Sequence, residues 1–264
     1  MSGPKPAASE RRGGRAPAHC RVLVEDPDLA AALPPAARER ASLECVVPLL
    51  RLPRGRVSAP PPLPGEGGIG LLVLDGLLFR RVGIDGRFGG ELLGEGDVLR
   101  PGYDEQEASL AFTTGWRVLE TSRIAVLDAR AAYRLARYPE LTGALVARAL
   151  ERSRNFAVNM AIVHQPKVEL RLHMLLWHLA GRWGRVGRDG VRVPLRLTHG
   201  VLADLVAARR PTVTGALAKL IAQGLVAHEA SGWLLRGAPP GELLEVRQVS
   251  LTQTDGPARA SAAR

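Results

Sequence analysis

Two arginines and two threonines lie close together between residues 208 and 214, where the chain reads ARRPTVT. Arg209 and Arg210 can bind phosphates or pair with guanine, and Thr212 and Thr214 can reach a phosphate or a thymine methyl group. The chemistry that these side chains indicate is recognition of duplex DNA.

The residues around this cluster predict two short helices that would present it to solvent. Thr198 can cap a first helix, and Ala207 with Ala208 permits a close turn. A second helix would begin near Arg210, with Pro211 tolerated in its first turn because the missing N–H has no helical partner there. The expected inward residues recur near the 3.6-residue period: Val201, Leu202, Leu205, Val206, Val213, Ala216, Leu217 and Leu220.

Elements on both sides of these helices complete the pattern of a winged helix-turn-helix. Residues 168–183 predict a helix, and residues 184–187 with 191–197 predict a hairpin. A second small hairpin, residues 225–228 and 233–235, would form the wing. We therefore expect a DNA-binding domain over residues 166–238, followed by a flexible tail over residues 239–264.

Positive charge is concentrated at the two ends of the chain. Residues 1–20 hold four Lys or Arg and one acid, residues 21–165 hold 18 of each, and residues 166–264 hold 14 against 7. A basic surplus beside a helix-turn-helix suits phosphate neutralisation. The small, Pro-rich and Gly-rich residues 1–20 predict a disordered basic tail.

Composition also limits the compartment and the class of protein. Of 264 residues, 46% are hydrophobic, which is enough for two domains with real cores. Two cysteines are too few for a disulfide framework, and neither a signal peptide nor a membrane-spanning run is evident. We expect a cytoplasmic protein that does not enter a membrane and is not an enzyme.

Short apolar runs separated by Gly and Pro clusters fill the chain between residues 43 and 128. This texture predicts an antiparallel sandwich or barrel, with a domain over residues 21–130. Two dipeptides, Asp75-Gly76 and Asp85-Gly86, are of the type found in hairpin turns.

From Ala129 to Gln165 the chain is rich in Ala, Leu and Arg and predicts one long helix, with residues 131–165 as a dimerisation helix. Its narrow apolar stripe could form a parallel dimer contact or cover the β domain. The expected stripe consists of Leu141, Leu145, Ala149, Phe156, Met160 and Val163.

A strand-rich domain, a long helix and a winged helix-turn-helix, in that order over about residues 43–236, resemble the Crp/Fnr family of bacterial transcription regulators. The most specific part is residues 172–225, including VPLRLTHGVLADLVAARRPTVTGALAKLIAQGLV. The resemblance implies an α+β fold with an N-terminal antiparallel β-roll of the double-stranded β-helix (jelly-roll) type, similar to a cyclic-nucleotide-binding domain. It also implies a homodimer on a palindromic operator, with one recognition helix in each major-groove half-site.

The family's functional residues transfer only in part. Its usual base readers are Arg, Glu and a second Arg four residues later, and the matching positions here are Arg210, Pro211 and Gly215. Arg210 is therefore the expected base reader, while the matches that the resemblance implies for the DNA backbone are Thr198, His199 and Arg209. The full set of predicted DNA-binding residues is Thr198, His199, Arg209, Arg210, Thr212, Thr214 and Lys219.

The sensor half departs further from the family. Nucleotide-binding members carry Gly-Glu and later Arg-Ser or Arg-Thr, whereas this chain has Arg100-Pro101, no Arg before Ser109, and an acidic loop with Asp104, Glu105 and Glu107. Carboxylates repel a cyclic phosphate, so cyclic AMP is not expected in the usual mode. Gly90-Glu91 lies at the wrong distance to replace the missing pair.

Two cysteines, Cys20 and Cys45, do not supply the ligands of an iron–sulfur cluster. His173 and His178 are five residues apart on a helix and do not share a face for a metal. A haem on Cys45 or on a histidine would leave no motif and stays a minor alternative, so the cofactor is unknown.

The sequence thus predicts a dimeric, sequence-specific transcription regulator that binds double-stranded DNA and is controlled by an unidentified effector in the β-roll. RNA polymerase is a further partner that such a regulator could contact. Two alternatives remain open. The first is a ligand-independent regulator whose β-roll is a dimer scaffold or protein-contact domain; the second is a sensing module whose helix-turn-helix no longer binds DNA.

Overall fold

The computed structural model of the chain describes residues 18–57, 67–100, 110 and 112–241. It divides into two compact units. The first contains residues up to Leu78, Leu92–Ala111 and Gly115–Arg152, and the second contains Phe79–Glu91, Phe112–Thr114 and the residues from Ser153 onward. The predicted tails at 1–17 and 242–264 and the acidic loop at 101–109 lie outside the described residues.

The first unit begins with a strand and three short helices. They are β1 (Ala18–Arg21), α1 (Val22–Glu25), α2 (Pro27–Ala31) and α3 (Pro35–Glu44). β1 pairs antiparallel with β2 (Val46–Leu52), and Cys20 lies opposite Val47. Residues 18–20, predicted as the end of a disordered tail, are therefore part of the sheet.

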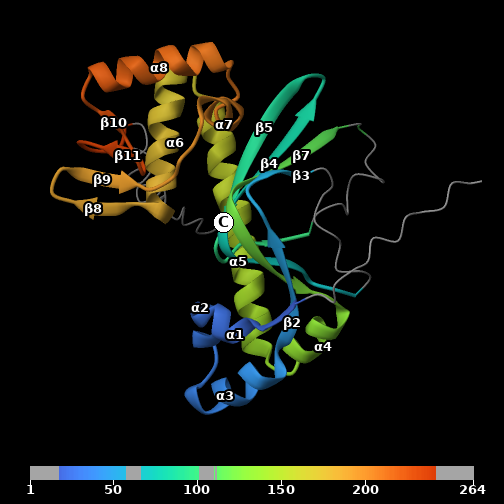
Figure 1. The fold of residues 1–264 in the computed structure, drawn as a ribbon. Coiled ribbons are helices and arrows are strands. Elements are labelled where there is room, and N and C mark those ends of the chain that lie inside the picture. Colours follow the sequence, from blue (N-terminus) through green and yellow to red (C-terminus); the bar gives the residue numbers. More distant parts are fainter. Residues whose placement is uncertain (1–17, 58–66, 101–109, 111, 242–264) are drawn as a thin grey trace, which may run out of the picture. The chain divides into compact units, whose positions relative to one another are not determined.

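An antiparallel sheet forms the centre of the N-terminal domain, as the sequence predicts (Figure 1). Its strand order is β1-β2-β7-β4-β5, with β3 also pairing with β7 and β6 with β4. The strands after β2 are β3 (Gly55–Val57), β4 (Gly70–Ile84), β5 (Arg87–Gly94), β6 (Val98–Leu99) and β7 (Thr113–Leu127).

One of the two predicted hairpin turns is confirmed, and the other is wrong. Asp85 and Gly86 join β4 to β5 with φ values of 48° and 71°, the left-handed backbone that two-residue hairpin turns require. Asp75-Gly76 instead lies inside β4. A Cβ on Gly76 would come within 2.4 Å of the Ser122 hydroxyl, so this glycine permits close approach of β7 rather than a turn.

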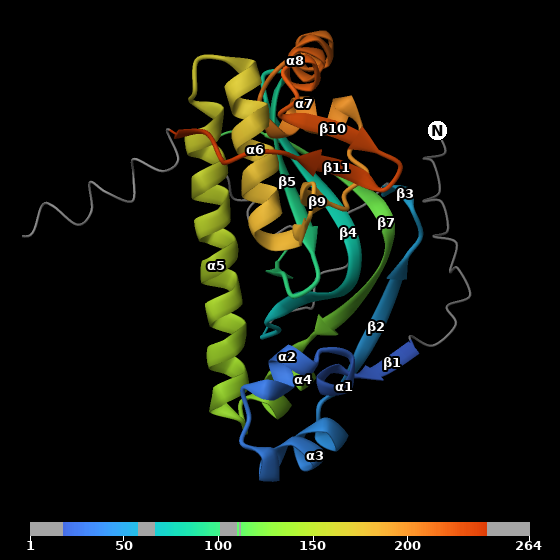
Figure 2. The same ribbon diagram turned by 90° about the vertical axis from the view of Figure 1, so that its left-hand side faces the viewer.

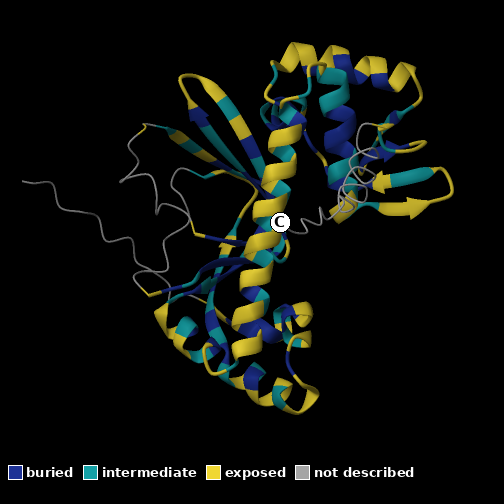
Figure 3. Ribbon diagram, turned by 180° about the vertical axis from the view of Figure 1, so that it is seen from behind, coloured by how far each residue is buried: buried dark blue, intermediate teal, exposed yellow. Residues whose placement is uncertain are grey.

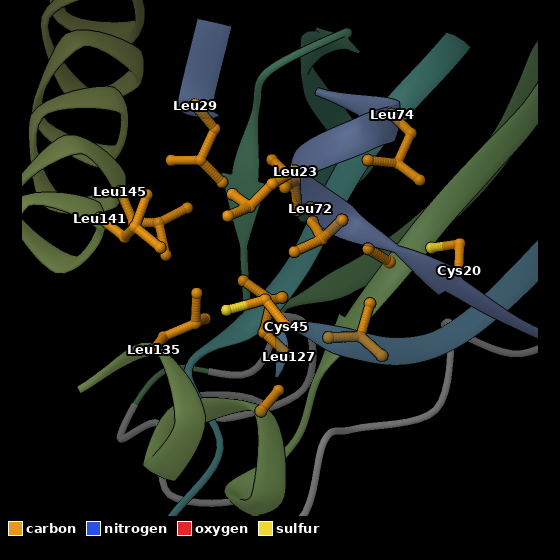
Figure 4. Close-up of a cluster of buried hydrophobic side chains, with 14 of the residues drawn as sticks. Cys20, Leu23, Leu29, Cys45, Leu72, Leu74, Leu127, Leu135, Leu141 and Leu145 are labelled. Carbon is orange, nitrogen blue, oxygen red and sulfur yellow. The ribbon is translucent and has the colours of Figure 1, made fainter. Parts of the chain in front are cut away.

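A cluster of buried apolar side chains joins the N-terminal helices, the sheet and the following helices within the first unit (Figure 4). The helices that follow β7 are α4 (Ala129–Leu135) and α5 (Pro139–Val163). Leu141 and Leu145 of α5 extend into this cluster beside Leu135. These first two residues of the predicted dimer stripe are therefore used in the core of their own subunit.

The predicted single helix from Ala129 to Gln165 is wrong, because the chain breaks it at residues 136–138. Asp128 caps α4 by accepting a hydrogen bond from the Ala131 N–H at 2.8 Å. Pro139 lacks an N–H and disfavours helical geometry at the residue before it, so α5 starts anew at this proline.

A buried ion pair fixes the N-terminal helices to α5. Asp26 caps α2 by accepting from the Leu29 N–H at 2.8 Å, and the same carboxylate binds Arg148 of α5. Arg148 Nη2 lies 2.9 Å from Asp26 Oδ1. Because both partners are largely buried, this pair fixes the position of α5 on the first unit.

The second unit contains the predicted winged helix-turn-helix. α6 spans Val168–Trp183, the same bounds that the sequence predicts, and α7 and α8 follow it (Figure 2). The small sheet has the order β10-β11-β9-β8, and both predicted hairpins are present. The elements after α6 are β8 (Arg185–Gly187), β9 (Gly190–Val193), α7 (His199–Leu205), α8 (Arg210–Ala222), β10 (Val226–Glu229) and β11 (Gly232–Leu235).

None of the helices in the described part of the chain combines the length and the apolar character needed to cross a membrane.

Candidate nucleic-acid interface

Two helices, α7 and α8, form the helix-turn-helix from the residues predicted for it. The Thr198 side chain caps α7 by accepting a hydrogen bond from the Val201 N–H at 3.3 Å. Pro211 lies in the first turn of α8, where a missing N–H costs nothing. All eight predicted inward residues are buried, so one face of each helix remains for solvent: Val201, Leu202, Leu205, Val206, Val213, Ala216, Leu217 and Leu220.

The turn between α7 and α8 depends on an unusual backbone conformation. Ala207 has φ of 49°, which is left-handed and costs a residue with a side chain about 1–2 kcal/mol. Arg171 of α6 donates to the Val206 carbonyl at 3.2 Å and to the Gln165 carbonyl at 2.6 Å. The sequence analysis missed Arg171, because nothing in its spacing indicates that its guanidinium reaches a turn 35 residues away.

The first turns of α8 present the predicted DNA-binding cluster to solvent (Figure 3). Arg209 precedes the helix as its N-cap residue, and Arg210 is its first residue. Both are exposed, as are Thr212 and Thr214. Neither arginine side chain has a hydrogen bond or an ion pair to another described residue, so both guanidinium groups are free to bind an external anion.

His199 and Thr214 connect the two helices at this surface. His199 Nδ1 lies 2.9 Å from Thr214 Oγ1, and that hydroxyl donates to the Arg210 carbonyl at 3.1 Å. The structure therefore brings together five of the seven predicted residues at the junction of the helices: Thr198, His199, Arg209, Arg210 and Thr214.

Lys219, also predicted to bind DNA, lies in the last turns of α8 and has an internal partner. Its ammonium is 2.6 Å from Glu169 Oε1 of α6, and this hydrogen bond holds the pKa of the Glu169 carboxyl below its usual range. Thr212 lies seven residues before Lys219, so both are on the same side of α8. A DNA role for Lys219 stays a prediction, and it requires competition with Glu169.

The tip of the β4–β5 hairpin supports α7 from within the same unit. Arg81 lies over the Phe88 ring, 3.3 Å from its centroid, and its Nε is 3.4 Å from Asp204 Oδ2. Asn159 of α5 donates to the Leu205 carbonyl at 3.5 Å. These side chains fix the end of α7 next to the turn, and no local sequence pattern predicts their contacts.

Two carboxylates of the β domain, Glu91 and Asp97, have structural partners. Glu91 forms an ion pair with Arg80 at 3.0 Å, with its side chain 10% exposed. Asp97 is buried and accepts a hydrogen bond from the Gly94 N–H at 2.8 Å. Glu91 is thus part of an internal ion pair.

Cys20 and Cys45 both lie in the apolar cluster of the first unit (Figure 4). Burial raises the pKa of each thiol above its ordinary value, and nearby Glu25 and Glu44 add to this effect. A raised pKa disfavours the thiolate that iron or haem ligation uses. Both side chains therefore pack in the apolar cluster as neutral thiols.

Comparison with known proteins identifies the class to which this site belongs. The Crp-like helix-turn-helix domain family matches residues 170–236. A search of curated protein sequences finds no match to the chain.

Several solved regulators share the fold at low sequence identity. The c-di-GMP-responsive global regulator CLP of Xanthomonas campestris is 19% identical with a TM-score of 0.56, covering 77% of this chain and all of CLP (100%). FixK2 of Bradyrhizobium japonicum is 16% identical with a TM-score of 0.55, covering 80% of this chain and 99% of FixK2. A CRP-family transcriptional regulator from Thermus thermophilus is 21% identical with a TM-score of 0.51, covering 78% and 98%.

The fold and the matched domain define a helix-turn-helix transcription regulator. The predicted resemblance to the Crp/Fnr family is confirmed: residues 170–236 are a Crp-like helix-turn-helix domain, and the chain has the fold of Crp/Fnr regulators. Because the resemblance is to regulators, it also supports the prediction that the chain is not an enzyme.

Proposed function

We propose that this protein is a homodimeric transcription regulator that acts in the cytoplasm and binds a palindromic operator by inserting α8 into the major groove. The observation that carries the proposal is the pair of exposed arginines at the start of α8, whose side chains have no partner among the described residues. Their charges are held beside a capped α7 by the buried apolar face of both helices, so they are positioned before DNA arrives.

Each cation in this cluster has a distinct expected role. Arg210 is the base reader, since a guanidinium pairs with both acceptors of guanine. Arg209, at the N-cap position, binds phosphate together with Thr198 and His199. Thr212 and Thr214 extend the same surface toward phosphate or a thymine methyl group.

A second copy of the chain is the proposed partner of α5. Leu141 and Leu145 of the predicted stripe are buried, whereas Ala149, Phe156 and Met160 of the same stripe are exposed. A different series recurs at alternating spacings of four and three along the exposed side: Val146, Leu150, Ser153, Ala157 and Met160. Val146, Leu150 and Met160 are 54%, 61% and 50% exposed. This 3.5-residue repeat is typical of a parallel helix pair.

Control by a small effector in the β-roll, and contact with RNA polymerase, complete the proposal. An effector would act by favouring one arrangement of the two recognition helices. A ligand-independent regulator, with the β-roll as scaffold, is the alternative. Native mass spectrometry of the freshly purified dimer distinguishes them, because a retained small molecule supports the effector and its reproducible absence supports the scaffold.

DNA titration at two salt concentrations tests DNA binding. We expect affinity to fall steeply between about 50 and 200 mM salt, and the Arg209→Ala/Arg210→Ala double variant to reduce the salt slope by about two. Arg56→Ala removes an exposed cation from β3 and serves as the control. No binding by the wild type at low salt, or the same slope in the double variant, would refute the proposal.

Sedimentation analysis tests the α5 pairing. Leu150→Glu places a charge within the proposed seam and is expected to yield monomers, whereas Leu150→Met keeps the seam apolar and should remain dimeric. A dimer in both variants would show that another surface joins the subunits.

A further inference from the structure

The hydrogen bonds around His199 point to Nδ1 as the ring nitrogen that carries hydrogen. Thr214 Oγ1 lies 3.1 Å from the Arg210 carbonyl, which can only accept, so the single hydroxyl hydrogen is donated there. The same oxygen is 2.9 Å from His199 Nδ1. Because the hydroxyl has no second hydrogen, it must accept from Nδ1–H.

This arrangement leaves Nε2 of the singly protonated ring with a lone pair and no hydrogen. A lone pair repels a phosphate oxygen. Nε2 becomes a donor only when the ring takes up a second proton, and then it donates a charge-assisted hydrogen bond.

We propose that His199 binds a DNA phosphate only after taking up a second proton, so that DNA binding by this protein is coupled to proton uptake at this ring. The inference rests on the proposed function, since it concerns the same surface. According to this inference, pH regulates DNA binding at that surface, and Thr214 is the residue that positions the His199 ring.

The charged groups around His199 favour proton uptake by its ring when DNA binds. The segment before α7 contributes Arg196, and α8 contributes Arg209 and Arg210, all of them exposed cations. The carboxylate on α7, Asp204, pairs with Arg81 instead, and Glu169 of α6 pairs with Lys219. An incoming phosphate brings negative charge next to the His199 ring and so favours its second proton.

The direction in which DNA affinity changes with pH follows from the linkage between proton binding and DNA binding. Since the DNA-bound state holds one more proton, affinity rises as pH falls and declines as pH rises. Imidazoles in general take up their second proton near pH 6.5, so the change falls between about pH 6 and pH 8. We expect the Kd of the full-length protein for random-sequence duplex DNA to increase roughly three- to tenfold over this interval.

Four variants separate proton uptake at His199 from titration of other groups. His199→Gln should remove the pH dependence, and His199→Arg should hold the low-pH affinity up to about pH 8 because its charge is permanent. Thr214→Val removes the acceptor, so the neutral ring can present Nε2–H and the pH slope should shrink. Thr214→Ser keeps the hydroxyl and should keep the slope.

Nitrogen NMR of the ¹⁵N-histidine-labelled protein without DNA tests the tautomer directly, with His199→Gln assigning the signal. The expected result is the Nδ1–H form near pH 8, shifting toward a mixture in Thr214→Val. An Nε2–H form in the wild type, or pH-independent DNA binding, would overturn the inference while the proposed function stands. Absence of DNA binding at every pH would overturn both.

Discussion

Arg171 of α6 donates a hydrogen bond through Nη1 to the carbonyl oxygen of Val206, 3.2 Å away, at the start of the turn that separates α7 from α8. Its Nε donates to the Gln165 carbonyl at 2.6 Å. One side chain therefore satisfies carbonyl groups both before α6 and in the helix-turn-helix. The recognition surface is held by this contact as well as by its apolar core.

Replacing this guanidinium tests how far the turn depends on it. Arg171→Met keeps much of the side chain's apolar bulk but leaves carbonyl groups without a donor, so we expect the free energy of unfolding to fall by about 1–3 kcal/mol. Urea denaturation measures the loss, and Arg196→Met, at an exposed position, is the control. A similar, small loss in both variants would contradict a special role for Arg171.

The left-handed backbone at Ala207 predicts a stabilising substitution. Ala207→Gly relieves the positive φ of 49°, and the gain should exceed the entropic cost of glycine by about 0.5–1 kcal/mol. Ala208→Gly, one residue later, carries only the entropic cost and should be destabilising. If thermal unfolding shifts both variants downward, the turn geometry is not as described.

The sequence predicted the helix-turn-helix well because its signals are local. The Thr198 cap, the position of Pro211 and the apolar period of α7 and α8 are set by neighbouring residues, and each is present in the structure. The hairpin turn predicted at Asp85-Gly86 is present for the same reason, because neighbouring residues set its conformation. Asp75-Gly76 has the same composition, but the approach of Ser122 from β7 decides its conformation.

Contacts between distant segments limited the remaining predictions. The stripe on α5 could not be divided between core and exposed surface, because Leu141 and Leu145 look like Val146 and Leu150 until the sheet is in place. The N-terminal helices α1–α3 were missed, although Pro35 at the start of α3 is a helix-start signal. Arg171, Arg81 and Asp204 hold the site through partners far along the chain.

Removal of Arg209 and removal of Arg210 should have different effects on DNA affinity and sequence preference. Arg210→Ala should weaken operator binding and relax preference at one base pair per half-site, by about 1–3 kcal/mol of discrimination. Arg209→Ala should weaken binding to all sequences by a similar factor. Competition titrations with single-base operator variants measure both, and equal losses on operator and random DNA for each variant would refute the division of roles.

Gly215 offers a gain of function. A Cβ at this position has no atom within 4 Å, so a larger side chain fits on the exposed face of α8. Gly215→Arg restores the second arginine of the family pattern and should raise DNA affinity, and it should raise the salt slope by about two counterions per bound dimer, one from each subunit. Gly215→Ala is the control: it should stabilise α8 by about 0.5–1 kcal/mol without changing the salt slope. An unchanged slope in the arginine variant would place this face away from DNA.

The ion pair between Lys219 and Glu169 predicts a further increase in affinity. Glu169→Gln removes the carboxylate that holds the ammonium at 2.6 Å, which frees Lys219 for phosphate. DNA affinity should rise at low salt, and the added substitution Lys219→Met should cancel the rise. If Glu169→Gln binds DNA no better than the wild type, then Lys219 does not take part in the interface.

The most direct test of the central claim is selection of duplexes from a random-sequence pool by the full-length protein. We expect an enriched palindrome whose half-sites are about one helical turn apart, roughly 10 base pairs, with a guanine in each half-site that Arg210→Ala no longer selects. A pool that stays random after selection, or the same enriched sequence with Arg210→Ala, would contradict recognition of DNA by α8.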